Sequence, residues 1–315
     1  MKRRIFSFLT AALMLVSLTA CGNPASIEDE SPNLPVVNTE APDLALDAAG
    51  VWEKMSQAVD GRLASSFTAT TEMGAKMDTG FMALDTQVSA ETDVKLSADP
   101  FCYYAATDLK ASFFGKEITG AFQMYSQSDE KGLDTWFHMD QKDNWYHYHA
   151  SMVPVDLLSQ YEITGCSGKW VPKDLTMEEQ TLDGAKVYVL TSDFKAEDVL
   201  TAISSPFGDI PFENVDISGL QLTTTYYVDS ESFLPVRIEI QYRGMSEVIG
   251  DLISRYAGEM MGGKLASMNV EVNTYREVLS NLVYGAVEVP AVPEEGIQNS
   301  REVTDSNIMK YLDLG

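Results

Sequence analysis

The sequence predicts a mainly β (α+β) protein built on a strongly curved antiparallel sheet, an open half-barrel whose concave face is covered by helices. Long segments alternate apolar and polar residues with a period of two, which is typical of antiparallel strands wetted on one side. Two segments, 47–60 and 245–261, carry apolar stripes with helical spacing. Because soluble proteins rarely expose a large apolar face, we expect these two helices to cover the concave side.

The first elements are a helix and two long strands. Asp47 can cap the helix, and Val51, Met55, Ala58 and Val59 fall on one of its faces. The period then changes to two after Gly61, with a turn at 78–80. The residues expected to face inward are Phe67, Ala69, Thr71, Met73, Ala75 and Met77 on the first strand, and Met82, Leu84, Thr86, Val88, Ala90, Thr92, Val94 and Leu96 on the second.

Further strands follow at regular spacing. A hairpin turn is expected at Asp183-Gly184. The predicted strands are 101–114, 117–127, 132–139, 144–150, 187–191, 220–228, 236–242 and 266–277. Short helices are expected at 154–161, in a less regular stretch from 151 to 174, and at 195–205. Pro290 and Pro293 argue against regular structure in the tail that begins near Ala286, and residues 303–313 fit either a weak helix or disorder.

The N-terminal segment has the features of a secretory signal. Lys2, Arg3 and Arg4 precede a short apolar run from Ile5 to Leu18, too short for a comfortable membrane span. Residues 22–46 are rich in Pro, Asp, Glu, Asn and Ala, a composition that cannot bury enough surface to fold. We therefore expect a signal peptide at 1–20, a disordered tether up to residue 46, a folded domain at 47–285 and a C-terminal tail at 286–315.

The residue after the signal is Cys21, in the sequence Leu-Thr-Ala-Cys. This motif resembles the lipobox of bacterial lipoproteins. The resemblance implies that the Cys21 thiol is acylated, that cleavage makes Cys21 the N-terminus, and that palmitate-type chains anchor the protein in the membrane. Two or three such chains anchor stably, because each buried methylene contributes roughly 0.8 kcal/mol. We expect a lipid-anchored protein on the extracytoplasmic face of the cell membrane; the type of envelope stays open.

The charge of the chain excludes one class of partner. The formal net charge is −25, and it becomes −28 once residues 1–20 remove Lys2, Arg3 and Arg4 (−25 minus 3). Phosphate binding needs clustered Lys and Arg, so such a surface repels nucleic acid and anionic headgroups. We expect no nucleic-acid partner.

A family resemblance extends over residues 47–285. The segment 226–236, Tyr-Tyr-Val-Asp-Ser-Glu-Ser-Phe-Leu-Pro-Val, together with the lipobox, the N-terminal helix and the strand series, looks like the LolA/LppX-type lipoprotein carriers. It looks closer still to a group of Gram-positive lipoproteins that share their half-barrel fold. The resemblance implies that a hydrophobic ligand, a lipid or an acylated molecule, lies between the curved sheet and a helical lid.

A carrier needs bulky, adaptable apolar side chains on its concave face. The chain has 15 methionines, and methionine lines surfaces that repack around varied ligands. The alternative is that the same residues form a packed core against the helices, and periodicity does not separate the two. The candidate ligand-binding residues are Met73, Met77, Met82, Leu84, Phe101, Tyr103 and Phe113.

All three histidines lie in one predicted hairpin, 134–149. With its loop at 140–143, His138 faces Trp145, Trp136 faces His147, and Asp134 shares their face. The set could bind zinc or copper or form an aromatic interaction patch, and a register shift of one residue would split it. We expect no metal site. Whether Cys102 and Cys166 form a disulfide is left open, with the predicted strand face of Cys102 arguing slightly against it.

Catalysis is not expected. The chain has no Gly-x-Ser-x-Gly, no His-Glu-x-x-His and no phosphate-binding glycine loop. We therefore expect neither catalytic residues nor a cofactor. The sequence favours a non-enzymatic lipoprotein that binds a hydrophobic ligand; the alternative is a surface interaction or sensory module with a fully packed interior and a protein partner.

Overall fold

The fold is that of a computed structural model. The structure describes residues 46–59, 64–78, 83–98, 100–113, 116–129, 132–140, 143–150, 172, 174–195, 219–247 and 269–303. The signal peptide with Cys21, the tether up to residue 45, the expected helix at 154–161, Met82, Cys166 and residues 304–315 lie outside these ranges. Of the helix expected at 195–205, only Lys195 is described, and it is the last residue of a strand.

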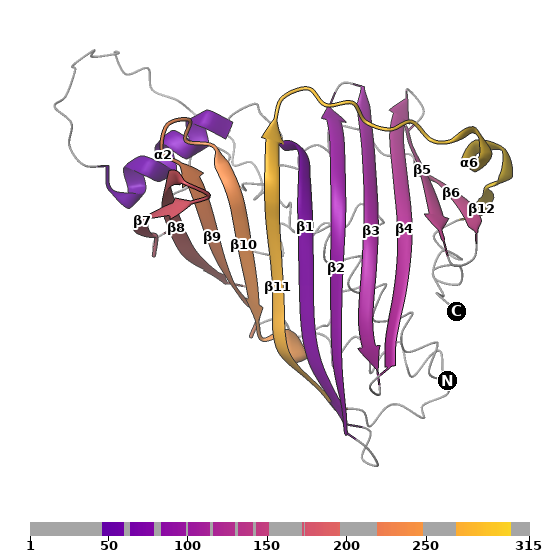
Figure 1. The fold of residues 1–315 in the computed structure, drawn as a ribbon, viewed down its shortest axis with the longest axis horizontal. Coiled ribbons are helices and arrows are strands. Elements are labelled where there is room, and N and C mark those ends of the chain that lie inside the picture. The colour runs from indigo at the N-terminus through magenta and orange to yellow at the C-terminus, as the bar shows by residue number, and fades with distance from the viewer. Residues whose placement is uncertain are drawn as a thin grey trace.

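The described strands form one curved, open, twelve-stranded sheet, as the alternation predicted (Figure 1). Its strand order is β12-β6-β5-β4-β3-β2-β1-β11-β10-β9-β8-β7, so a meander of five strands lies on one side of β1 and a second group lies beyond β11. Neighbouring strands are antiparallel except β12 and β6, which run parallel. The strands are β1 (Ala64–Asp78), β2 (Ala83–Ala98), β3 (Phe101–Phe113), β4 (Lys116–Asp129), β5 (Gly132–Met139), β6 (Asn144–Ala150), β7 (Thr176–Leu182), β8 (Ala185–Lys195), β9 (Gln221–Asp229), β10 (Pro235–Arg243), β11 (Asn269–Tyr284) and β12 (Arg301–Val303).

One face of the sheet, called the inner face below, carries the main core. On β1 every second residue from Phe67 to Ala75 is buried, and on β3 the same holds from Phe101 to Ala111. The alternation predicted for these strands is therefore confirmed. The intervening residues on the outer face are mostly half-buried or exposed. This asymmetry is what an antiparallel sheet with a single buried face requires.

Helix α2 (Ala48–Val59) packs on the inner face over the β8–β9 side of the sheet (Figure 1). The backbone N–H of Gly50 donates a 2.8 Å hydrogen bond to Oδ1 of Asp47, which confirms the predicted cap. The Trp52 ring meets the Tyr226 ring edge-on, with centroids 5.5 Å apart. Of the second expected helix, 245–261, the described part is its first turn, where Met245 is buried.

The motif at 226–236 forms the β9–β10 hairpin. The Asp229 carboxylate accepts hydrogen bonds from the backbone N–H of Ser232 at 2.8 Å and from its hydroxyl at 2.7 Å. These bonds from Ser232 hold the pKa of Asp229 below its usual range. Phe233 has a φ of 56°, and Pro235 opens β10, where its missing N–H is least costly. The motif is therefore a turn with local side-chain support.

The C-terminal part of the chain differs from the prediction. Strand β11 extends to Tyr284, seven residues beyond the expected end at Glu277, because an irregularity near Asn281 (φ 56°) interrupts the alternation without ending the strand. After Pro293 the tail forms helix α6 (Glu294–Asn299), and β12 follows as an edge strand. Gly296 lies so close to Trp145 that a Cβ there would be 2.7 Å from the ring, so α6 can lie flat on the sheet.

Cys102 is a free thiol. It lies on β3 on the same face as Asp108 and Lys110, as the alternation predicted. Within the described ranges no helix has the length and apolarity to cross a bilayer.

Gly244→Ala tests the connection between β10 and the helical turn at Met245. Gly244 has a φ of 76°, and a Cβ there would lie 2.1 Å from the carbonyl oxygen of Gly219. We expect a loss of at least about 2 kcal/mol in the free energy of unfolding, from left-handed strain and backbone overlap, measured by urea denaturation. Gly74→Ala is the matched control, because its Cβ would meet Thr274 only at 3.8 Å; equal losses in the two variants would contradict the geometry.

Candidate functional site

Three of the candidate ligand-binding residues lie on the inner face, and the backbone register does not gather the candidate set into one place. Met73, Phe101 and Tyr103 are buried in the main core cluster. Met77 pairs with Leu84, and Phe113 pairs with Thr86, near the end of β1 and the start of β2. Phe101 and Tyr103 begin β3, twelve positions from Phe113, which corresponds to roughly 40 Å along the strand. The predicted set therefore spans the length of the sheet, and its role in ligand binding stays a prediction.

A row of polar residues crosses the middle of the inner face. The register pairs Ser192 with Thr224, Thr224 with Ile240, Ile240 with Glu277, and Glu277 with Thr71. All five side chains are buried. We call Ser192, Thr224, Glu277 and Thr71 the inner polar row. It runs from β8 to β1 across five neighbouring strands, in a face that is otherwise largely apolar.

Glu277 is the one ionisable residue of the inner polar row. It has no exposed surface, and neither carboxyl oxygen has a hydrogen-bond partner. Burial alone raises the pKa of Glu277 to about 8, since desolvation disfavours the charged form. The group is therefore a neutral carboxylic acid at pH 7, with one donor and one acceptor unused.

Two other hydroxyl groups on the inner face share this condition, one close to Glu277 along β11 and one three strands away on β8. The Tyr275 hydroxyl, two residues along β11, is buried without a partner, and so is Oγ of Ser192. Burial raises the pKa of Tyr275 well above its usual value. By contrast, Thr92 bonds Thr107 at 2.9 Å on the same face. The sheet thus satisfies some inner hydroxyl groups with each other but leaves those of Tyr275, Ser192 and Thr86 unpaired.

The sequence did not reveal Glu277 because β11 changes its inward side. Val272 packs toward the core, and a period of two from Val272 would place Arg276 inside and Glu277 outside. A register shift between Gly74 and Ala75 pairs Ala75 with Val272 but Met73 with Tyr275. The extra residue in β11 turns Tyr275, Glu277 and Leu279 inward. The available signal was the spacing of Tyr275 and Leu279 around Glu277.

The histidine hairpin has the predicted register on the outer face. His138 pairs with Trp145 and Trp136 pairs with His147; the rings of each pair stack with centroids 4.6 and 4.8 Å apart. Trp136 and Trp145 form a buried cluster with Tyr125, against which Val292 of the C-terminal segment packs. This outer aromatic patch faces away from the main core.

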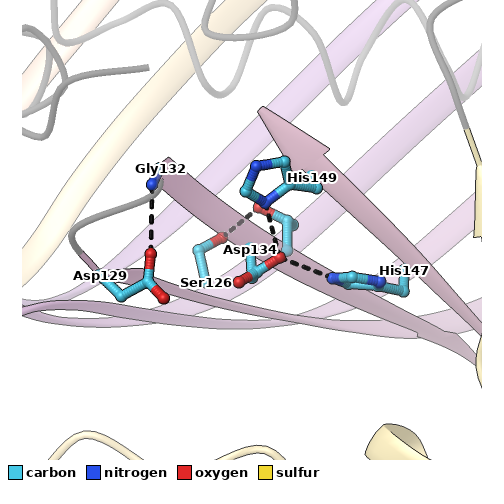
Figure 2. A network of polar contacts seen from close by, with 7 residues as sticks. Ser126, Asp129, Gly132, Asp134, His147 and His149 are labelled. Carbon is cyan, nitrogen blue, oxygen red and sulfur yellow. Dashed lines mark hydrogen bonds and ion pairs between the residues drawn. The ribbon is translucent and has the colours of Figure 1, made fainter. Parts of the chain in front are cut away.

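Asp134 holds two of the three histidines (Figure 2). Its Oδ1 lies 2.8 Å from Nε2 of His147 and 3.0 Å from Nδ1 of His149. Partial burial would raise the pKa of Asp134, but the hydrogen bonds from His149 and His147 outweigh it and hold the pKa below its usual range. His138 lies 3.2 Å from Asp140 and 3.3 Å from Asp143. In the part of the chain that the structure describes, no three His, Cys, Asp or Glu side chains are arranged to hold a metal ion.

Comparisons with protein-family models and with curated proteins find no match. Among solved structures, the chain is similar to LprF from Mycobacterium bovis (TM-score 0.37, 11% identity, 78% of this chain and 96% of that chain). It is also similar to a DUF1329 family protein from Desulfovibrio piger (TM-score 0.24, 12% identity, covering 76% and 94%). A third match is a domain named for outer membrane lipoprotein sorting from Vibrio parahaemolyticus (TM-score 0.23, 10% identity, covering 84% and 100%).

The buried acid predicts an unusual pH dependence of stability. The folded protein retains a proton on Glu277 that the unfolded chain releases above its ordinary pKa of 4.5. The contribution of Glu277 to stability is therefore greatest below about 4.5 and declines as the pH rises towards 8. We expect Glu277→Gln to be more stable than the wild type by less than about 1 kcal/mol at pH 5 and by a few kcal/mol at pH 8, since each pKa unit is worth about 1.4 kcal/mol.

Urea denaturation at pH 5, 6, 7 and 8 measures this difference. Glu91→Gln is the control, because it removes a carboxylate from an exposed position of β2. Stability curves of wild type and Glu277→Gln that run parallel over this range would show that Glu277 ionises freely in the folded protein.

Proposed function

We propose that this chain is a non-enzymatic lipoprotein, anchored through acyl chains on Cys21 to the extracytoplasmic face of the cell membrane. Its folded domain binds a hydrophobic ligand, a lipid or an acylated molecule, on the concave inner face beneath helical cover. The observation that carries the proposal is the inner face itself: a continuous, largely apolar surface on a sheet that curves without closing into a barrel.

The chemistry of that face supports an adaptable ligand. Met73, Phe101 and Tyr103 belong to it, and flexible methionines with flat aromatic rings adjust to ligands of different shape. Helix α2 packs over β8 at its border, and a helical turn begins at the buried Met245. Ligand affinity would come mainly from burial of apolar surface, worth roughly 25 cal/mol per Å².

The electrostatics of the chain support a binding domain held away from the membrane. A net charge of −28 after removal of the signal repels the anionic headgroups of the bilayer, so the anchor at Cys21 holds the chain to the membrane against this repulsion, to which the acidic tether at 22–46 adds. The same potential disfavours ligands with anionic headgroups.

A second candidate function is a surface module that binds a protein partner. The histidines of the β5–β6 hairpin support it, because His147 and His149 remain partly exposed on the outer face beside the buried Trp136. In that case the interior is fully packed and carries no ligand.

Native mass spectrometry separates the two functions. The chain from Gly22 to Gly315 keeps every described residue and lacks only the signal and the acylation site. We expect it to co-purify with lipid that organic extraction releases and identifies. Protein that carries no lipid, and that takes up none from added vesicles, would contradict the carrier function and favour the interaction module.

Cys21→Ser tests the anchor. We expect the variant to incorporate no alkyne-labelled palmitate and to leave the membrane fraction, because the serine hydroxyl does not replace the thiol in the acyl transfer that the lipobox resemblance implies. The control is Cys102→Ser, whose thiol lies on β3. Labelling that persists in Cys21→Ser would place the lipid elsewhere.

A further inference from the structure

The buried carboxyl group of Glu277 requires an explanation beyond the fold. Its neighbours across the sheet are Thr71 and Ile240, and its neighbours along the inner side of β11 are Tyr275 and Leu279. A leucine or valine would bury as well at this position without leaving polar atoms unsatisfied. An unpartnered buried polar group lowers the free energy of unfolding by about 1–3 kcal/mol. The presence of Glu277 on the inner face therefore indicates that its carboxyl group has a function.

We propose that Glu277 and the Tyr275 hydroxyl form the polar recognition point for an uncharged, hydroxyl- or ester-bearing group of the ligand. This inference rests on the proposed ligand binding at the inner face and specifies the ligand as a neutral amphiphile of the glyceride class. The protonated carboxyl donates to an ester carbonyl or hydroxyl oxygen and accepts from a hydroxyl group, and the tyrosine supplies a second donor.

The surroundings of Glu277 argue against a charged headgroup. Within the described residues, the only cause of its altered pKa is burial, with no contribution from a neighbouring cation. An anionic headgroup would therefore enter an acidic protein without a basic partner. A cationic headgroup would require Glu277 to lose its proton, and a buried ion pair must repay the desolvation of both charges. A neutral group needs neither.

The contrast with other hydroxyl groups of the same face supports this assignment. Thr92 and Thr107 bond each other, and so do Ser126 and Thr135, at 2.9 and 3.0 Å. These pairs lie on the β2–β5 side of the sheet. The unpaired atoms of Glu277, Tyr275 and Ser192 lie on β11 and β8. Thr86 on β2 is also buried without a partner, so what sets Glu277 and Tyr275 apart is that they lie two positions from each other on the inner side of β11.

Three probes with the same ten-carbon chain test the proposal: monodecanoylglycerol, decanoate and decylamine. Binding to the chain from Gly22 to Gly315 is measured by isothermal titration calorimetry at pH 7 and pH 9, below the aggregation concentration of each probe. We expect monodecanoylglycerol to bind most tightly at pH 7. Its affinity should fall at pH 9, because Glu277 ionises between these values and loses its donor.

The variants separate recognition from folding. Glu277→Leu keeps the apolar volume and should weaken monodecanoylglycerol binding about tenfold, and Tyr275→Phe should weaken it about threefold, as expected for lost hydrogen bonds. Glu277→Gln retains a donor and an acceptor, so it should keep the affinity measured at pH 7 and lose the pH dependence. Glu91→Gln should behave like the wild type, and circular dichroism confirms folding of each variant.

Two results would overturn the assignment while leaving ligand binding intact. One is wild-type affinity for monodecanoylglycerol in Glu277→Leu together with an unchanged pH dependence in Glu277→Gln. The other is a preference for decylamine that strengthens towards pH 9, since that would identify Glu277 as the counter-ion of a cationic ligand. Failure of the wild type to bind any of the three probes would instead remove the proposed function and this inference with it.

Discussion

The pairing of β1 with β11 is the constraint on which the rest of the structure depends. It joins segments about two hundred positions apart in the chain, and it connects the meander β2–β6 to the strands β7–β10. Without it, each half would expose an edge and lose the continuity of its buried face. The inner face is therefore continuous across both halves of the sheet only because β1 and β11 pair in this register.

The details of that register decide the chemistry of both faces. The extra residue in β11 near Asn273 turns Glu277 inward and Arg276 outward. On the outer face Arg276 bonds Glu239 at 2.5 Å, beside the Arg237–Glu239 contact at 2.7 Å. Partial burial would raise the pKa of Glu239, but these guanidinium groups lower it below its usual range. Two glutamates on adjacent strands thus have opposite protonation behaviour, one paired with cations and one isolated in the core.

Most of the fold could be predicted from the sequence, but little of the candidate site could be. Strands β5 and β6 end where the alternation ends, and the loop at 140–143 was enough to align His138 with Trp145. Local periodicity fails where the chain departs from it: at the two irregularities of β11, and at α6 and β12, whose short segments are held by contacts of Gly296 and Val303 with distant strands. Glu277 was missed for the same reason, since a one-residue shift in register reverses its face.

A ligand that hydrogen-bonds to Glu277 would couple binding to stability. Any molecule that binds only the folded state stabilises it in proportion to its concentration relative to its dissociation constant. A neutral ligand also favours the protonated form of Glu277, so it raises that pKa further and stabilises the fold most at pH values where Glu277 keeps its proton. The protein without ligand is then the state in which the buried acid is most costly. An acid on the inner face therefore has an effect that a leucine would lack. The stability of the domain would depend on whether a ligand is hydrogen-bonded to Glu277.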